Sequence, residues 1–199
     1  DFTPELREQA LQELGDRRTG PLYTPPSLGG SVQMPGELGG ADWVGGAVDP
    51  TTGVLFIGSK TRPDATFLIP VDDAEAFSAF GGRAQFFGFL DGLPLTTPPY
   101  GRFTAIDMTT GEQLWMRPMG TGPVNHPALA DVEDLPKTLG WPTRSFPLVT
   151  PDLLFVTLED PRSFNPVGGP YFVQRDASLF ALDKETGAHV AELPLPDNP

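Results

Sequence analysis

Few side chains in this sequence have the types and spacing that catalysis or metal binding requires. The acidic cluster Asp131, Glu133 and Asp134 carries oxygen ligands that suit Ca²⁺. It lacks the glycine register of a calcium-binding loop, so we expect solvated loop acids. Of the two histidines, His126 lies in a loop and could reach a substrate, whereas we expect His189 at the surface. We predict no catalytic residue and no metal ligand within this chain.

Composition excludes several function classes. The absence of cysteine removes disulfides, thiolate metal sites and cysteine nucleophiles. A formal net charge of -13 opposes binding to nucleic acid or to an anionic membrane surface. Neither Gly29-Gly30 nor Gly39-Gly40 is followed by the residues of a phosphate-binding loop. No apolar run approaches the ~20 residues that span a bilayer.

The elements that position the remaining residues are predicted to be strands and turns. Gly and Pro number 23 and 24 of 199 residues, about twice the usual share, which argues against a helical bundle. Hydrophobic residues make up 39% of the chain, which is too apolar for disorder. We therefore predict an all-β fold with one short N-terminal helix, capped by Thr3-Pro4 and stopped at Gly15.

An internal repeat organises the rest of the chain. The signature Ala-x-Asp-x-x-Thr-Gly occurs three times between apolar runs, with Asp49, Asp107 and Asp183 as its aspartates, and a fourth hairpin turns at Pro151-Asp152. The repeats are farther apart than the roughly 40–50 residues of other propeller blades, which indicates insertions. This pattern predicts a fragment of a β-propeller with about two four-stranded blades.

The expected organisation is a single propeller fragment, 1–199. It comprises an N-terminal helix (1–19), a Gly/Pro-rich pocket loop without regular elements (20–46), a first blade (47–118), an insertion (119–144) and a second blade (145–195). Within the first blade, 72–93 form an insertion with weak helical spacing. Two blades cannot close a ring, and the chain starts at Asp1 rather than Met, so we expect a piece of a longer protein.

Three segments resemble a known enzyme family. Ala105-Ile106-Asp107-Met108-Thr109-Thr110-Gly111-Glu112-Gln113-Leu114-Trp115 looks like the tryptophan-docking motif that repeats around the eight-bladed propeller of quinoprotein dehydrogenases. Gly20 to Ser27, followed by Met34 to Trp43, resembles the segment that opens the late blades of the membrane-bound glucose dehydrogenase type, and Thr97 to Gly101 fits its place before the docking motif. The chain thus resembles the C-terminal part of a dehydrogenase that depends on pyrroloquinoline quinone (PQQ).

The resemblance implies an oxidoreductase that oxidises an alcohol or a glucose-like aldose and passes the electrons to PQQ, with Ca²⁺ beside the quinone. The family's catalytic base and calcium ligands lie in other blades, so we expect this chain alone to be catalytically incomplete. Expected partners are the alcohol or sugar substrate and the remaining blades, or further copies of the chain. The implied location is the periplasm. Any membrane contact would be made by other parts of the longer parent protein to which this chain belongs.

The resemblance also implies that the pocket loop forms one wall of the cofactor site, with Glu37, Leu38 and Trp43 as cofactor-binding residues. Trp43 offers a flat apolar contact to a planar quinone. The alternative is that Trp43 seals the interface between the blades. Glu37 stands where family members usually have asparagine. An anionic cofactor would repel the Glu37 carboxylate unless that carboxylate is protonated or metal-bound. The alternative is that Glu37 is a solvated acid on the loop.

The docking positions are expected to be structural. Trp115 is predicted to wedge between the two blades, and Ala191 replaces the corresponding tryptophan in the third repeat. A second function stays open at this point, that of a non-catalytic propeller-type module that binds or assembles partners. Such modules share the repeat but do not generally carry the segment Met34 to Trp43.

Overall fold

The computed structural model describes residues 2–37, 39–41, 45–73, 77–86, 89–90, 92–160 and 176–196. In chain order the elements are α1 (Pro4–Leu14), β1 (Ser31–Gln33), β2 (Gly46–Asp49), β3 (Val54–Lys60), β4 (Asp64–Pro70), β5 (Phe80–Phe86), β6 (Phe89–Leu90), β7 (Leu93–Pro94), β8 (Gly101–Asp107), β9 (Gln113–Pro118), the 3-10 helix η1 (Pro127–Leu129), β10 (Ser145–Val149), β11 (Leu153–Asp160), β12 (Asp176–Asp183) and β13 (His189–Leu195). No described helix is long and apolar enough to cross a membrane.

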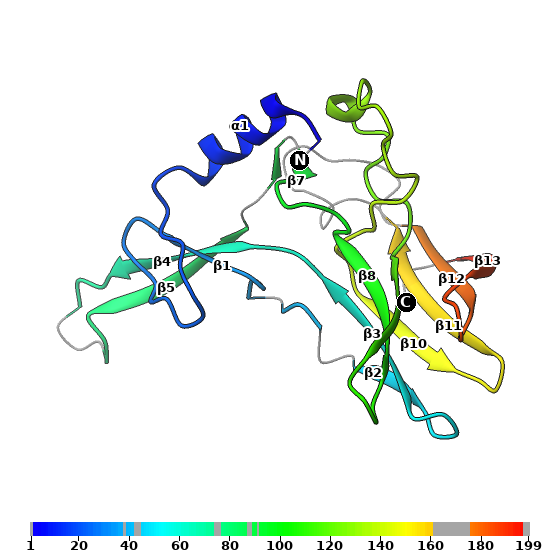
Figure 1. Cartoon of the computed structure of the whole chain (residues 1–199). Helices are drawn as coiled ribbons and strands as arrows, with labels where there is room; N and C mark the ends of the chain where they lie inside the picture. Colours follow the sequence, from blue (N-terminus) through cyan, green and yellow to red (C-terminus); the bar gives the residue numbers. More distant parts are fainter. Residues whose placement is uncertain are drawn as a thin grey trace.

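Two four-stranded antiparallel sheets form the body of the molecule, in the strand orders β2-β3-β8-β9 and β10-β11-β12-β13. They lie side by side in Figure 1. The alternation of apolar residues along each strand sends one face of each sheet into a shared core. Phe56, Phe103 and Trp115 of the first sheet pack there with Leu154 and Val156 of the second. The two sheets are the blade-like units predicted from the repeat.

A third sheet, β1-β4-β5, was not predicted from the sequence. Its long hairpin of β4 and β5 extends away from the two larger sheets as an arm (Figure 1). The weak helical spacing noted within 72–93 does not continue as a helix past residue 79, because residues 80–86 pair with 64–70 as β5. The pocket loop also contains a regular element, since Ser31–Gln33 pairs with β4 as β1. Pairing with a strand outside each segment decided both outcomes.

The N-terminal helix forms as predicted and covers a second apolar cluster. The Oγ1 atom of Thr3 accepts the backbone N–H of Leu6 at 3.2 Å, and Gly15 ends the helix at a φ of 55°. No residue of α1 is fully buried, so the helix is a cover rather than a core element. Leu6 packs against a cluster of Leu93, Tyr100, Leu129 and Leu139, which the insertion and the chain before β8 provide.

Candidate functional site

The three repeat aspartates each close a turn. Asp49, Asp107 and Asp183 accept backbone N–H groups two or three residues ahead, at distances of 2.9, 2.7 and 2.8 Å. The Thr109 backbone N–H holds the pKa of Asp107 below its usual value, and the Thr186 hydroxyl, aided by its backbone N–H, does the same for Asp183. The repeat signature is therefore a recurring turn structure, with a glycine at positive φ in its last position.

Trp115 joins the first sheet to the third of these turns. Its indole Nε1–H donates to the backbone carbonyl of Lys184 at 3.0 Å, and its ring lies 5.8 Å from that of Phe56, centroid to centroid. A side chain at Gly187 would begin 2.7 Å from the indole Cε3, so only glycine fits beneath the ring. These contacts confirm the prediction that Trp115 wedges between the two blades.

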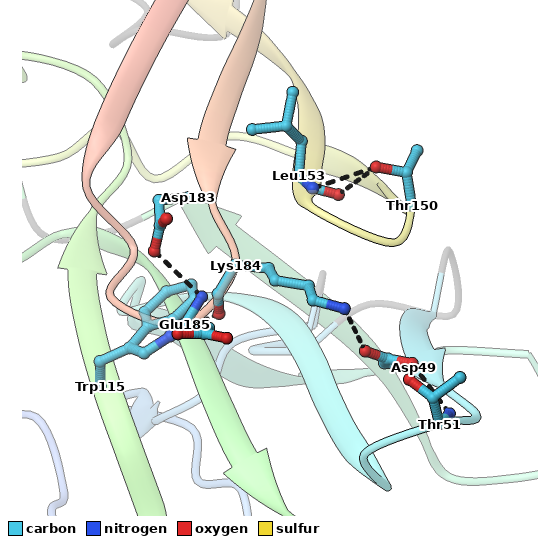
Figure 2. Close-up of polar contacts among 8 residues, drawn as sticks. All are labelled: Asp49, Thr51, Trp115, Thr150, Leu153, Asp183, Lys184 and Glu185. Carbon is cyan, nitrogen blue, oxygen red and sulfur yellow. Dashed lines mark hydrogen bonds and ion pairs between the residues drawn. The ribbon is translucent and has the colours of Figure 1, made fainter.

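An ion pair ties the same turn to the beginning of the first sheet. The Nζ atom of Lys184 lies 2.6 Å from Oδ2 of Asp49, and the side chains point toward one another in Figure 2. The Lys184 ammonium, aided by the hydroxyl and backbone N–H of Thr51, holds the pKa of Asp49 well below its usual range. The turn that contains Lys184 thus contacts β9 through Trp115 and the end of β2 through Asp49.

The third repeat has the same local geometry without the aromatic ring. Ala181 is paired with Ala191 as Ala105 is paired with Trp115, and each strand pair has an irregularity directly after that position. Ala191 therefore occupies the position of the docking tryptophan, as its place in the sequence predicts. The second sheet offers no indole there.

The predicted cofactor residues lie on the loop before β2. Glu37 is described and exposed, whereas Leu38 and Trp43 lie outside the described residues. The Glu37 backbone N–H donates to Oδ2 of Asp64 at 2.8 Å. Sequence reasoning missed Asp64, which is the first residue of β4. Its only signal was a charged run, Lys60 to Asp64, between two apolar strands.

Three charged side chains lie buried where β3 passes into β4. We call residues 60–64 the elbow. Lys60, Arg62 and Asp64 are 4, 2 and 0% exposed, and Nε of Arg62 lies 3.8 Å from Oδ1 of Asp64. Buried charges are costly unless they are paired or hydrogen-bonded, so this cluster requires a structural or functional reason.

The other predicted candidates are not assembled into a site. His126 is buried, and its Nδ1 accepts the backbone N–H of Ala128, so it caps η1 rather than facing a substrate. His189 is exposed and meets the edge of Phe180. Over the part of the chain that is described, no three His, Asp or Glu side chains gather as a metal site.

Cavities open beside the large sheets and beside α1. One of about 670 Å³ lies between the two large sheets, with Phe103 and Phe180 in its lining and Arg117, His189 and Glu192 among its polar groups. A smaller one of about 250 Å³ lies between α1 and the chain around Leu93. Among the described residues that line these two cavities, Glu37 does not occur.

Comparisons with known proteins identify a family and several relatives. The family model for the PQQ type of glucose/ethanol/alcohol dehydrogenase β-propeller domain matches residues 1–199. The glycerol dehydrogenase large subunit of Gluconobacter thailandicus is 30% identical over 87% of this chain and 25% of its own length. A probable quinate dehydrogenase (quinone) of Xanthomonas campestris pv. juglandis is 31% identical over 88% of this chain and 23% of its own.

A third relative has a different substrate in its name. Quinoprotein glucose dehydrogenase A of Acinetobacter calcoaceticus is 33% identical over 50% of this chain and 14% of its own length. The chain thus spans about a quarter or less of the relatives that it matches. The three names give glycerol, quinate and glucose as substrates, so these relatives do not share one substrate.

Proposed function

Because this chain belongs to the β-propeller domain family of PQQ-dependent glucose, ethanol and alcohol dehydrogenases, we propose that it forms two blades of such an enzyme. The observation that carries this proposal is the match of that family over residues 1–199. The match confirms the resemblance identified in the docking motif. The two four-stranded sheets, with one short α-helix among the described residues, confirm the predicted all-β propeller class.

The proposed activity of the parent protein is oxidation of a CH–OH group in an alcohol or a sugar. PQQ, when bound, supplies the two-electron acceptor, and the protein supplies binding, orientation and electrostatics. This chain contributes no catalytic residue in the proposal. Catalysis depends on blades outside it, which accords with a chain about a quarter as long as its relatives.

The described residues fit a supporting wall of the PQQ site rather than a complete one. Glu37 is exposed on a loop whose backbone is hydrogen-bonded to the elbow, so its carboxylate is free to face a ligand. Like charges repel, so this carboxylate suits PQQ only when a proton or a cation lies between them. In the proposal Leu38 and Trp43 complete the wall, with the indole against the planar ring.

Calcium is proposed to lie beside PQQ on ligands from elsewhere in the parent. No cluster of three suitable side chains is present among the residues whose structure is described. Asp131, Glu133 and Asp134, which have ligand chemistry, are exposed loop residues. Removal of Ca²⁺ is therefore expected to leave the two sheets of this chain intact while it lowers PQQ affinity.

The partners of this chain are proposed to be the neighbouring blades of the same propeller. The outer face of the first sheet carries exposed Val48, Leu114 and Met116, and that of the second carries Phe146 and Leu193. Apolar faces of this kind require cover in water. The parent is proposed to work in the periplasm, where any membrane contact is made by its other parts.

The test uses the full-length parent, purified without PQQ and titrated with PQQ in the presence of Ca²⁺. Native mass spectrometry and absorbance report binding, and oxidation of glucose, glycerol, ethanol and quinate with an artificial acceptor reports activity. We expect one PQQ per chain and oxidation of at least one of these substrates. A parent that neither binds PQQ nor oxidises any of them would instead be a non-catalytic binding module.

A matched pair of tryptophan variants tests the wall. Trp43→Ala is expected to weaken PQQ binding by about tenfold, the scale of one aromatic contact. Trp115→Phe, which changes a tryptophan between the sheets, is expected to leave PQQ affinity unchanged. Equal PQQ affinity in wild type and Trp43→Ala would remove Trp43 from the cofactor site.

A further inference from the structure

The pocket loop is fastened to the elbow along its backbone. The Gly36 N–H donates to the carbonyl of Arg62 at 2.9 Å, and the Lys60 N–H donates to the carbonyl of Gly40 at 3.0 Å. Between them, Glu37 donates to the carboxylate of Asp64 at 2.8 Å. Gly36 and Glu37 are thus held at one end of this stretch and Gly40 at the other, with the buried Asp64 side chain as one of the three acceptors.

The fit between loop and elbow leaves no space for a side chain at Gly36. A Cβ atom there would collide with the Oδ2 and Cγ atoms of Asp64 and lie 3.0 Å from the Arg62 carbonyl. At Gly40, in the same loop, the nearest atom to a Cβ would be 3.4 Å away, which is close to ordinary contact. The close approach is therefore specific to the point where Asp64 meets the loop.

The elbow itself is held from its other side. Thr61 donates its backbone N–H to the carbonyl of Tyr100 at 2.7 Å, and the Arg102 guanidinium bonds the Thr61 hydroxyl at 2.7 Å. Arg102 also donates to the carbonyl of Pro99. Because β3 and β8 belong to the first sheet, the elbow is a fixed point of the blade rather than part of a free loop.

We propose that Asp64 is a positioning residue for the cofactor wall, which holds the Gly36–Glu37 backbone against the blade so that Glu37 and its neighbours face PQQ in one arrangement. This inference rests on the proposed function for the identity of the ligand, whereas the fastening of the loop stands on the geometry alone. A buried carboxylate that accepts a backbone N–H makes a stronger bond than a neutral acceptor. Fixed supports of this kind are what binding sites on loops require.

The charge distribution explains why an acid is suited to this role. Lys60 and Arg62 bring two cations into the elbow, and Asp64 is a buried acid 3.8 Å from the Arg62 guanidinium. A neutral acceptor at position 64 would hold the Glu37 N–H but leave the Arg62 guanidinium without its nearby carboxylate. One carboxylate oxygen of Asp64 accepts the backbone N–H of Glu37, and the other faces the Arg62 guanidinium.

The first experiment measures amide hydrogen exchange over residues 34–41 in the full-length parent without PQQ. Asp64→Ala is expected to speed exchange of the Gly36 and Glu37 amides about tenfold or more. Asp64→Asn retains an acceptor oxygen and is expected to rescue most of that protection. Asp49→Asn is the matched control, because it also removes a buried, ion-paired carboxylate but lies at the far end of the first sheet.

The second experiment measures PQQ affinity of the same proteins by absorbance titration. Asp64→Ala is expected to raise the Kd for PQQ about tenfold or more, because a displaced wall loses its alignment with the ligand. Substrate KM in fully PQQ-loaded enzyme is expected to stay unchanged, which separates cofactor positioning from general damage. Asp49→Asn is expected to leave the PQQ Kd as in wild type.

A glycine pair gives the same test without a change of charge, and serves if Asp64→Ala fails to fold. Gly36→Ala is expected to speed loop exchange and weaken PQQ, whereas Gly40→Ala is expected to do neither. Unchanged exchange in Asp64→Ala and Gly36→Ala would overturn the fastening. Faster exchange with unchanged PQQ affinity would overturn the positioning role. A wild-type parent that binds no PQQ would overturn the proposed function. The hydrogen-exchange result would still decide whether Asp64 holds the loop.

Discussion

The indole N–H of Trp115 donates to the carbonyl of Lys184, a residue 69 positions later in the chain and in the other large sheet. Lys184 in turn reaches Asp49, 135 positions earlier, through its side chain. One turn of the second sheet thus meets both the first and the last strand of the first sheet. The seam between the two sheets depends on these few residues and on the apolar core beside them.

Truncation of Trp115 is expected to weaken the seam strongly. Trp115→Ala removes a buried ring and is expected to lower the free energy of unfolding by about 3–5 kcal/mol. Trp115→Phe keeps most of the ring but loses the hydrogen bond to Lys184, at a cost nearer 1 kcal/mol. Urea unfolding of the parent measures both. Met108→Ala, on an exposed turn, is the control, and a Trp115→Ala loss no larger than that control would contradict the wedge.

Alanine substitutions at the turn glycines Gly187 and Gly111 distinguish the cost of backbone strain from the cost of disturbing the Trp115 contact. Both have positive φ, so alanine costs about 1–2 kcal/mol at either position. Only at Gly187 does the added Cβ meet the indole of Trp115, whereas nothing lies within 4 Å at Gly111. Gly187→Ala is therefore expected to cost about 1–3 kcal/mol more in urea unfolding. Equal losses of unfolding free energy in the two variants would show that the close contact between Gly187 and the Trp115 indole does not contribute to stability.

The Asp49–Lys184 pair predicts a loss of stability in acid. Lys184 holds the folded-state pKa of Asp49 below the unfolded value of about 3.9, so the unfolded state binds the proton first. The pair contributes fully above about pH 5, and its contribution is lost as the pH falls toward the folded-state pKa.

Lys184→Met is accordingly expected to be less stable than wild type at pH 7 and to lose less stability between pH 5 and pH 2. The urea midpoint measured across that range gives the comparison. Lys137→Met, which removes an exposed lysine, serves as control. Parallel pH profiles for Lys184→Met and wild type would show that the pair has no coupling to folding.

Tyr100 predicts a loss of stability in alkali. Its side chain is fully buried, its hydroxyl has no hydrogen-bond partner among the described residues, and burial raises its pKa. Above about pH 10 the unfolded state releases this proton while the folded state retains it, so stability falls as pH rises.

Tyr100→Phe is expected to change stability by less than about 1 kcal/mol at pH 7 and to reduce the loss above about pH 10. Thermal unfolding from pH 8 to pH 11 measures the difference. Tyr23→Phe, at a highly exposed tyrosine, is expected to follow wild type throughout. An alkaline loss as large in Tyr100→Phe as in wild type would assign that loss to other groups.

The repeated turns and the wedge could be predicted because each depends on a short stretch of sequence. Asp, Thr and Gly in the signature make hydrogen bonds within a few residues of one another, so Asp107 and Asp183 close their turns without help from elsewhere. Trp115 stands at a fixed place after such a turn. Local chemistry of this kind survives in any context that leaves the turn intact.

The arm and the elbow could not be predicted, because both depend on segments distant in the chain. The run Phe80–Phe86 contains two adjacent glycines and little strand propensity, and it becomes a strand by pairing with β4. Lys60, Arg62 and Asp64 belong to residue types that are mostly exposed. Contacts from the pocket loop and from Arg102, both distant in the chain, meet them where they are buried. Glu37, Leu38 and Trp43 stay predictions as cofactor residues.

The long separations across the seam have a consequence for biosynthesis. All four strands of the first sheet end by Pro118, so this sheet can form as soon as Pro118 is available. Its inner face, with Phe56 and Trp115, has no partner until β11 and the Lys184 turn have been made. A nascent chain therefore carries an uncovered apolar sheet through the synthesis of some dozens of residues. That interval is where a chaperone would be needed, and where a slow ribosome would favour aggregation over docking.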